Sequence, residues 1–296
     1  MKLIEQELNL MNSEISKSLL SSDNKLSSDI YDLVFAKSKR LRPKLIFLFA
    51  NAFNKPVNDK VIALACATEL LHNSSLIHDD IIDNSDTRRG KETLNKKFGN
   101  SISVLAGDYL LSLAMQFLCK CDNINCLQEF SKSLQLMCNG EINQHFELKK
   151  IPLIDDYIQK SQNKTAELYR ASLLSLCHVL NINNSKGVEE FAINFGIAFQ
   201  LKDDLINIKN TDPLKPAFSD VLNGIYTAPV IFLNKDVDVK SISSEKILEL
   251  LLKDNKYFEQ SDNLIKLHVE KAINSLTLIE NNEYKEEILN LARNLI

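Results

Sequence analysis

Apolar residues recur every three or four positions along most of the 296-residue chain, and this spacing limits the possible folds more than any other feature. Such spacing puts the apolar side chains on one face of an α-helix, whereas a half-buried strand alternates apolar and polar residues. Turn-forming residues are scarce, with 7 Gly and 6 Pro. The polar breaks between helical stretches are too short and too poor in Gly and Ser to be domain linkers. The sequence therefore predicts an all-α protein with one helical domain over residues 1–296.

The composition argues against several classes of partner. The formal net charge is -4, and because a nucleic-acid-binding surface would be basic and clustered, we expect no nucleic-acid partner. The longest apolar stretch runs from Ile102 to Cys119 and is interrupted by Asp108, so we expect no transmembrane segment. The cysteines show no paired CxxC pattern, and the N-terminus has no signal-peptide core. These features are typical of a cytoplasmic protein with free thiols.

The most unusual segment is LIHDDIIDNSDTRRG, residues 76–90, which gathers four aspartates and two arginines. It ends a long apolar stretch, and we predict a central, largely buried helix from about Asp59 to Asp83. Residues four apart lie on the same helical face, so Asp79 and Asp83 point the same way while Asp80 is turned about 100° away. Two carboxylates on one face, with oxygen ligands only, suit a hard cation such as Mg²⁺.

A second acid pair, Asp203 and Asp204, ends another apolar helix in the stretch FQLKDDLINI. Asp203 is predicted to supply the opposite wall of the metal site. A solvated helix end explains a single acid pair equally well, but two such ends favour a metal site. A third pair, Asp155 and Asp156, follows a proline at a predicted helix start, where acids favour the helix dipole. We interpret that third pair as a helix cap.

Two basic groups accompany the acids. Arg88 and Arg89 directly follow the first acid cluster and fit as phosphate forks beside a metal. Lys39, Arg40 and Arg42 precede a helix that a proline can open. Taken alone, this second group is explained as well by an ordinary basic turn. The arginines nevertheless favour a phosphate site next to the predicted metal.

A set of segments resembles, in order, the motifs of the trans-type polyprenyl diphosphate synthases, most closely the octaprenyl type. The segments are KRLRP (39–43), LLHNSSLIHDDIIDNSDTRRGKET (70–93), FGNSISVLAGDYLL (98–111), MCNGEINQ (137–144), KTAELYRAS (164–172), FQLKDDLIN (199–207) and KPAFSDVLNGIYTAPV (215–230). The resemblance spans roughly residues 37 to 232. It implies an isoprenoid-synthase-type helical bundle around a central cavity, and a homodimer.

The chemistry that the resemblance implies is the condensation of two diphosphates. An allylic diphosphate ionises, the double bond of isopentenyl diphosphate attacks the carbocation, and a proton is lost to the released diphosphate. Separating the cation from diphosphate is the barrier, so the enzyme must neutralise the leaving group, for which the family uses three Mg²⁺ ions. By resemblance, Asp79 and Asp83 hold two of these ions and Asp203 holds the third.

The resemblance also implies three groups of residues that contact substrate. The residues implied to bind the allylic diphosphate are Arg88, Lys164 and Lys215. The residues implied to bind the metal-free isopentenyl diphosphate are Lys39, Arg42, His72 and Arg89. Thr165 and Gln200 are implied to face the cation with oxygen dipoles. For His72, whose simplest explanation is a core histidine, the position seven residues before Asp79 favours the substrate role.

The sequence departs from the family pattern at a few positions. Asn207 replaces the third acid of the second motif and brings no charge. Ile225 occupies the place of a second loop lysine, and Lys37 and Ser38 replace the glycines before KRLRP. Asn207 and Ile225 both weaken the predicted anion clamp, so lower activity or greater reliance on Asp204 for the metal would follow.

Product length is predicted from the residues four and five before the first aspartate, which are Ser75 and Ser74. Bulky aromatics there close the family's product tunnel, whereas small residues resemble the long-chain synthases. The serines can equally serve to let helices pack closely. The alternatives are a shorter-chain geranylgeranyl or farnesyl diphosphate synthase and a non-catalytic synthase subunit. A terpene cyclase on the same fold needs no isopentenyl site, so KRLRP and His72 argue against it.

Overall fold

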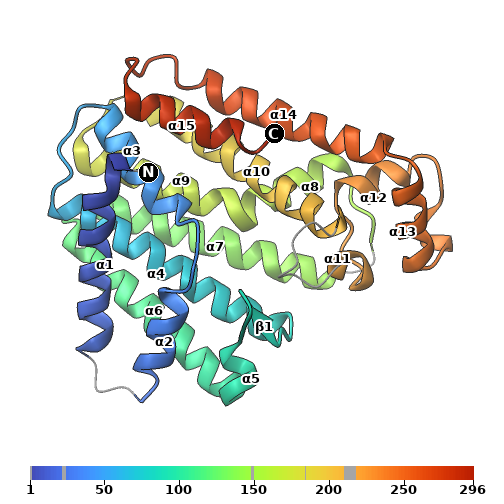
Figure 1. Cartoon of the computed structure of the whole chain (residues 1–296), viewed down its shortest axis with the longest axis horizontal. Helices are drawn as coiled ribbons and strands as arrows, with labels where there is room; N and C mark the ends of the chain where they lie inside the picture. Colours follow the sequence, from blue (N-terminus) through green and yellow to red (C-terminus); the bar gives the residue numbers. More distant parts are fainter. Residues whose placement is uncertain (1, 22–24, 148–149, 184, 210–217) are drawn as a thin grey trace. The chain divides into compact units, whose positions relative to one another are not determined.

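The protein is built almost entirely of helices (Figure 1). The computed structural model describes residues 2–21, 25–147, 150–183, 185–209 and 218–296. Within these ranges the only sheet is an antiparallel hairpin of β1 (Thr87–Arg88) and β2 (Lys91–Glu92), in which Thr87 pairs with Glu92 and Arg88 with Lys91. The predicted all-α class is confirmed.

The chain divides into two compact units. The first comprises Met1–Phe130, Ala171–Ser185 and Ile279–Ile288, and the second comprises Ser131–Arg170, Lys186–Leu278 and Leu289–Ile296. The helices of the first unit are η1 (Lys2–Ile4), α1 (Glu5–Leu20), α2 (Ser27–Val34), α3 (Leu41–Ala52), α4 (Asp59–Ile82), α5 (Leu94–Phe98) and α6 (Asn100–Lys120). The single domain expected over residues 1–296, with a central cavity, stays a prediction.

The second unit holds the remaining elements. Its helices are α8 (Ile154–Ser161), the π-helical turn η2 (Gln162–Ala166), α10 (Ser185–Lys209), α11 (Ser219–Leu222), α12 (Ala228–Leu233), η3 (Val239–Ser241), α13 (Ser244–Lys253) and α14 (Lys256–Asn274). The first residue of α10, Ser185, belongs to the first unit, and three further helices contribute residues to both units: α7 (Ile124–Phe146), α9 (Glu167–Leu180) and α15 (Glu283–Arg293).

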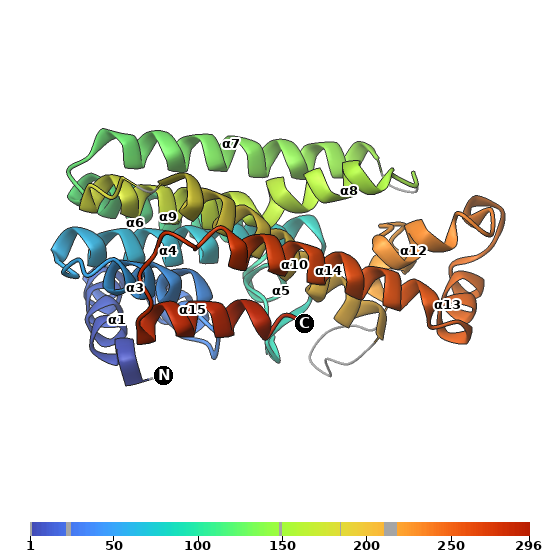
Figure 2. The same ribbon diagram turned by 90° about the horizontal axis from the view of Figure 1, so that it is seen from above.

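Helix α4 is the centre of the first unit, as its sequence predicted. Every residue from 61 to 71 is buried, because apolar side chains cover the whole circumference of the helix there. The Asn58 side chain caps the helix by accepting a hydrogen bond from the Val61 backbone N–H at 3.1 Å. Helix α4 lies between α6 on one side and α1 and α3 on the other (Figure 2). Its C-terminal end is thereby held rigidly.

Helices α4 and α6 cross at very short range. The Ser74 hydroxyl of α4 donates to the Gly107 carbonyl of α6 at 2.8 Å. A Cβ on Gly107 would lie 2.2 Å from Nε2 of His78, so a larger residue there would displace the imidazole. The same histidine lies 3.4 Å from the Asp108 carboxylate. These contacts fix the register of α4, and with it the direction in which the first acid cluster points.

In the second unit, close packing surrounds the π-helical turn η2. The backbone N–H of Glu167 bonds to the Gln162 carbonyl, five residues back, which widens the helix by one residue. A Cβ on Gly196 of α10 would lie 2.4 Å from the Ala166 Cα atom. Because only glycine permits that approach, α10 and the π-turn are locked together.

Among the residues that the structure describes, α6 is the one helix whose length and composition would allow it to cross a membrane. Its most apolar window has a mean hydropathy of 1.6, and 44% of that window is buried inside the protein. A core helix of a soluble protein passes the same test, so this helix does not decide the matter. The absence of a transmembrane segment stays a prediction.

Candidate active site

The first acid cluster forms the C-terminal end of α4. The Asp83 backbone N–H donates to the Asp79 carbonyl at 2.8 Å, so the two side chains lie one turn apart on the same face. Asp79 is half-buried, and Asp83, at the C-cap, is exposed. The relative geometry predicted from the helical period is therefore present in the first unit.

Asp80, between them, has a different role. Its side chain is buried, and Arg88 donates to the same Asp80 oxygen from Nε and from Nη2, each at 2.7 Å. Burial raises the pKa of the Asp80 carboxyl, and the Arg88 guanidinium counters part of that rise. From the sequence we assigned Arg88 only to a phosphate. In the structure it also neutralises the buried member of the acid cluster.

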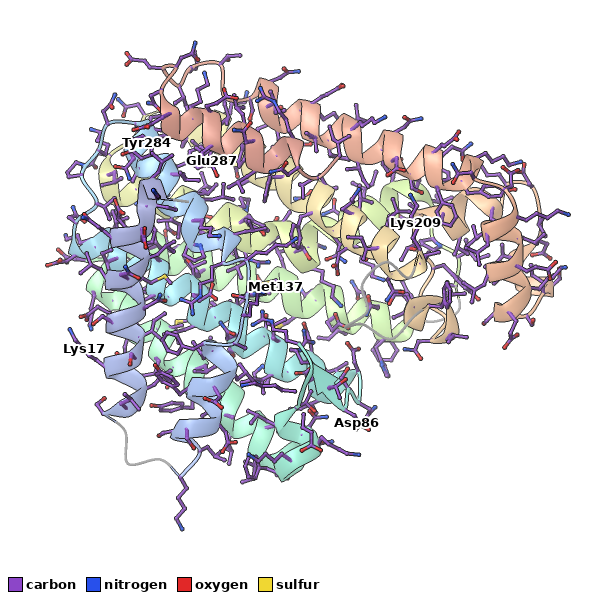
Figure 3. The ribbon with its side chains drawn as sticks, in the orientation of Figure 1. Lys17, Asp86, Met137, Lys209, Tyr284 and Glu287 are labelled. Atoms are coloured by element: carbon purple, nitrogen blue, oxygen red, sulfur yellow. The ribbon has the colours of Figure 1, made fainter. Side chains whose placement is uncertain are left out.

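The β1–β2 hairpin presents Arg88 to this acid. Its turn residues Arg89 and Gly90 both have positive φ, 51° and 77°, which is the pattern of the tight hairpin turns. Asp86, at the start of the hairpin (Figure 3), pairs with Lys96 at 3.2 Å. The turn therefore holds two adjacent arginines in fixed and different directions.

Backbone carbonyls at the end of α4 anchor the segment that follows the hairpin. Asn95 Nδ2 donates to the carbonyls of Asp80 and Ser85 at 3.3 and 3.1 Å. The Thr93 hydroxyl donates to the Ser85 carbonyl at 2.7 Å and also caps α5. These bonds satisfy carbonyls that the helix end would otherwise leave exposed.

A basic cluster surrounds Glu69, a buried acid of α4 on the N-terminal side of the first acid cluster. We did not assign Glu69 from the sequence. Glu69 is buried, and its Oε1 lies 4.0 Å from Arg40 Nε. Burial raises the pKa of Glu69, and the charges of Arg40, Arg42 and Arg89 counter the rise. A lone acid inside the apolar stretch ALACATELL was the available sequence signal, since such an acid needs a partner.

His72, three residues after Glu69, belongs to the same cluster. Burial first, and then the charges of Arg42, Arg89 and Arg88, keep the pKa of His72 well below its ordinary value. The imidazole is therefore neutral at physiological pH and can donate a hydrogen bond without adding charge. Within the first unit, three of the four residues predicted to bind isopentenyl diphosphate thus act on one another electrostatically.

Arg40 anchors the segment that contains Lys39, the fourth residue predicted to bind isopentenyl diphosphate. Arg40 has a φ of 46° just before α3. Its guanidinium donates to Asn12 and, at 3.3 Å, to the Val34 carbonyl, and it lies 5.2 Å from the centroid of the Phe35 ring. Lys39 is exposed beside this anchor. Arg40 is therefore a structural residue of the predicted anion site.

The two serines predicted to set product length both have hydroxyl partners. Ser74 is buried and its hydroxyl bonds to Gly107, as described above. Ser75 is half-buried, and its hydroxyl donates to the His72 carbonyl of its own helix at 2.8 Å. The close-packing explanation of Ser74 is thus supported, and Ser75 is the position with more room. Their role in product length stays a prediction.

In the second unit, α10 carries a continuous hydrogen-bonded chain. The Thr165 hydroxyl donates to Gln200 Oε1 at 2.5 Å, and Gln200 Nε2 donates to Asp204 Oδ1 at 2.6 Å. Tyr157 of α8 donates its hydroxyl to the other oxygen, Asp204 Oδ2, at 2.5 Å. Burial and then the Asp220 charge raise the pKa of Asp204 to about 7. Each Asp204 oxygen therefore accepts one hydrogen bond.

Lys164 lies in the π-turn next to Thr165. Its ammonium pairs with the Glu141 carboxylate of α7 at 3.0 Å, so a motif of α7 neutralises it. A second lysine, Lys160, is half-buried nearby, and burial and the Lys164 charge lower its pKa. The orientation of Lys164 and Thr165 could not be predicted from the sequence. It is set by the π-turn that contains them.

The remaining predicted residues of the second unit are described in part. Asp203 is half-buried next to Asp204 on α10. Asn207 is buried one turn on, and Ile225 is half-buried. Lys215 lies outside the described residues. The roles of Asp203 and Lys215 stay predictions.

The donor set of α4 fits a hard cation. Asp79 and Asp83 offer carboxylate oxygens on one face, while Asp80 is occupied by Arg88, so a bound Mg²⁺ would complete its shell with water and phosphate oxygens. No group of three His, Cys, Asp or Glu side chains in the described parts of the chain could by itself hold a metal ion.

The family of the chain follows from comparison with known sequences. The sequence profile described as Polyprenyl synthetase matches residues 24–267. The chain is also 30% identical to a prenyl transferase of Cyanidium caldarium, over 99% of this chain and 96% of the relative. The chain belongs to the polyprenyl synthetase family. This polyprenyl synthetase is therefore a prenyltransferase, and the family and enzyme class predicted from its motifs are confirmed.

Other relatives of this polyprenyl synthetase differ in the products that their names give. It is 33% identical to the chloroplastic solanesyl-diphosphate synthase 2 of Oryza sativa subsp. japonica, over 89% of this chain and 66% of the relative. Two solved structures have the same fold. They are the octaprenyl pyrophosphate synthase of Helicobacter pylori (TM-score 0.83, 26% identity, 98% of each chain) and the geranylgeranyl pyrophosphate synthetase of the archaeon Geoglobus acetivorans (TM-score 0.84, 27% identity, 99% of each chain). Enzymes of this family generally depend on Mg²⁺.

Proposed function

We propose that the protein condenses isopentenyl diphosphate onto an allylic diphosphate and releases a long all-trans polyprenyl diphosphate. The observation that carries the proposal is that three neighbouring acids at the C-terminal end of α4 have different roles. Asp79 and Asp83 share one face of the helix end, while Arg88 neutralises the buried Asp80. Such an arrangement suits metal-bound diphosphate, because the buried charge of Asp80 is already cancelled and the two outer carboxylates lie on one face, where both can bind cations.

The allylic diphosphate would bind at the two aspartate motifs. Bound Mg²⁺, three ions in this proposal, supplies positive charge that stabilises the leaving diphosphate. Asp79, Asp83 and Asp203 would hold the ions, and Lys164 would hold phosphate oxygens together with the proposed ligands Arg88 and Lys215. Lys164 would exchange its Glu141 partner for phosphate. Thr165 and Gln200 would face the carbocation with their oxygens.

Isopentenyl diphosphate would bind to the basic cluster of the first unit. Arg42 and Arg89 are held near the buried Glu69, and His72 is neutral beside them. Lys39 is exposed at the edge of that cluster. Forked guanidinium donors match a diphosphate without a metal, and a neutral imidazole adds a directed donor. No side-chain base is required, because the released diphosphate can take the proton.

For product length, two kinds of observation support the long-chain proposal. Ser74 and Ser75 are small, so neither fills space below the acid cluster. One relative is named a solanesyl-diphosphate synthase, and one solved neighbour is named an octaprenyl synthase. The runner-up is a shorter-chain synthase, supported by the solved geranylgeranyl synthetase. A non-catalytic subunit is disfavoured by the complete set of Asp79, Asp83 and Arg88.

Assembly and location are also part of the proposal. Helix α6 exposes Ile102, Val104 and Leu105, with side chains 37%, 42% and 62% accessible. An apolar stripe of this kind would be covered in a homodimer, the state that the family resemblance implies. We place the protein in the cytoplasm on its free thiols, noting that one relative is a chloroplastic enzyme.

One product analysis tests the function. The purified protein is incubated with farnesyl diphosphate, radiolabelled isopentenyl diphosphate and Mg²⁺, and dephosphorylated products are separated by chain length. The proposal expects long products that disappear when the metal is chelated. Products no longer than geranylgeranyl would support the runner-up. No incorporation by a folded protein, unless a second protein is added, would support the non-catalytic subunit.

A further inference from the structure

A positioning residue for the reaction lies outside every motif considered above. Tyr157 of α8 is 3% exposed, and its hydroxyl donates to Asp204 at 2.5 Å. The tyrosine hydroxyl does not bond to Gln200 or Thr165 directly. It reaches them through the carboxylate, because the three hydrogen bonds share Asp204 and Gln200 as links.

The chemistry of the links fixes the direction of every bond. In the structure Asp204 receives the Tyr157 hydroxyl on one oxygen and the amide nitrogen of Gln200 on the other, which is the arrangement that the ionised form, an acceptor only, requires. Gln200 then has its carbonyl oxygen at the opposite end, facing the Thr165 hydroxyl. Thr165 must therefore donate to Gln200, at 2.5 Å.

The orientation of the Gln200 amide determines which way the Thr165 hydroxyl proton points. Because its proton points toward Gln200, the hydroxyl offers only lone pairs in its other directions. If the Gln200 amide turned over, its N–H group would face Thr165, and the threonine proton would be directed outward. A carbocation beside this oxygen is stabilised by the first arrangement and repelled by the second, since the dipole is reversed.

We infer that Tyr157 is a positioning residue that, through Asp204, fixes the amide of Gln200 and thereby the hydroxyl of Thr165 as an oriented acceptor for the allylic carbocation. This inference rests on the proposed function. It adds a residue from a different helix, and it gives Asp204 an orienting role in place of metal ligation. It also explains why Tyr157 is buried against α10, where a phenylalanine would fill the same volume.

The test measures the single-turnover rate of the first condensation, with farnesyl diphosphate and labelled isopentenyl diphosphate. A single turnover excludes product release, which often limits steady-state rates. Tyr157→Phe is expected to lower that rate about tenfold and to leave the KM of both substrates within about twofold, because the lost bond acts on the transition state and not on binding.

The chain offers a matched control. Tyr257 is also buried, and its hydroxyl donates to an aspartate, Asp236, at 2.9 Å in the same unit. Tyr257→Phe removes a tyrosine–aspartate bond elsewhere, to an exposed aspartate that also pairs with Lys256, and should leave the single-turnover rate unchanged. If both variants lose rate equally, Tyr157 has only a structural role and the inference is overturned.

A double variant separates orientation from general packing. In a Thr165→Val background the oriented hydroxyl is absent, so Tyr157→Phe should have no further effect on rate. An additive tenfold loss there would overturn the inference. Asp204→Asn is the second probe if Tyr157→Phe does not fold. It replaces one acceptor oxygen by an N–H donor, so the amide of Gln200 is no longer held in a single orientation, and it should lower the rate about tenfold in wild type and not in Thr165→Val.

These outcomes are distinct from failure of the proposed function. A wild-type protein that incorporates no isopentenyl diphosphate defeats the function itself. A wild-type protein that condenses normally, alongside Tyr157→Phe and Asp204→Asn variants with unchanged rates, keeps the function and removes Tyr157 from it.

Discussion

Arg88 binds a single oxygen of Asp80 through two of its nitrogen atoms, each 2.7 Å away. The acid is buried on α4 and the arginine is carried by the hairpin that follows. This pair couples the end of the helix to the hairpin, and it removes one negative charge from a cluster whose members would otherwise repel one another. The first aspartate motif is thus a partly neutralised structure before any metal binds.

Replacement of Arg88 should therefore affect stability as well as catalysis. Arg88→Leu leaves the buried Asp80 carboxylate without its forked donor, and we expect a loss of about 1–3 kcal/mol in the free energy of unfolding. Urea denaturation measures the loss. In the double variant Arg88→Leu/Asp80→Leu most of it should be recovered, because no buried charge remains. An Arg88→Leu protein as stable as wild type would contradict the structural role.

Removal of an outer carboxylate should affect catalysis without a comparable effect on stability. Asp79→Ala is expected to lower turnover by at least about a hundredfold, the scale for loss of an electrostatic group that acts in the transition state. Excess Mg²⁺ should recover little of the activity. Asp203→Ala should behave in the same way. Asp156→Ala, at the exposed start of α8, is the control and should retain full activity.

The basic cluster should discriminate between the two substrates. Lys39→Ala and Arg42→Ala are expected to raise the KM for isopentenyl diphosphate about tenfold or more, with a much smaller effect on the allylic primer, since each removes a contact to one diphosphate only. Steady-state kinetics with each substrate varied in turn makes the comparison. Lys37→Ala, exposed two positions upstream, should change neither constant. Equal effects on both substrates would defeat the assignment of two separate pockets.

Product length should respond at Ser75 more cleanly than at Ser74. A phenylalanine at Ser74 would collide with α6, because the serine hydroxyl is only 2.8 Å from the Gly107 carbonyl. Ser75→Phe has more space and is expected to shorten the products to about geranylgeranyl length while the first condensation persists. Chain-length analysis of dephosphorylated products decides this. Unchanged long products from a folded Ser75→Phe protein would remove Ser75 from the tunnel wall.

The stability of the protein should fall in acid because of a buried histidine. His268 is 5% exposed, its Nδ1 lies 2.8 Å from Asn194 Oδ1, and burial lowers the pKa of His268 to about 4. Because the unfolded chain takes up the proton near pH 6.5, the stabilising contribution is present above that pH and is lost as pH falls toward 4. The loss should be about 3 kcal/mol.

His268→Gln keeps a hydrogen-bond donor and does not titrate in this range. Its unfolding free energy should therefore depend less on pH between about 6.5 and 4 than that of wild type. Urea denaturation across this pH range measures both proteins. Parallel curves would show that other groups cause the acid dependence.

The parts of the site that follow from helical period alone could be predicted from sequence. The placement of Asp79 and Asp83 needed only a helix and a spacing of four, and the apolar circumference of residues 61–71 was sufficient to predict a central helix. Partnerships across elements could not be predicted in the same way. Arg88 reaches Asp80 only because the hairpin turns at Arg89 and Gly90.

Other parts of the site depend on close packing, which has no periodic signature. Nothing near Tyr157 indicates that it will meet Asp204, and nothing in QNKTA, residues 162–166, indicates a widened helical turn. The contact of Glu69 was partly predictable. A lone acid in an apolar helix indicates that a partner is needed, but not which arginine provides it. The sequence thus provided candidate residues for the site, whose roles stay predictions, but not their contacts with one another.

The widened turn at Gln162–Ala166 has a consequence for insertions and deletions. A π-turn holds one residue more than an α-helical path of the same direction. Deleting a single residue there would restore ordinary helix, and because the π-turn absorbs its extra residue locally, the segment on its N-terminal side would keep its direction. Tyr157 would then stay at Asp204. A deletion in the regular helix of α8, between Tyr157 and the π-turn, would instead rotate Tyr157 by about 100° and remove it from Asp204.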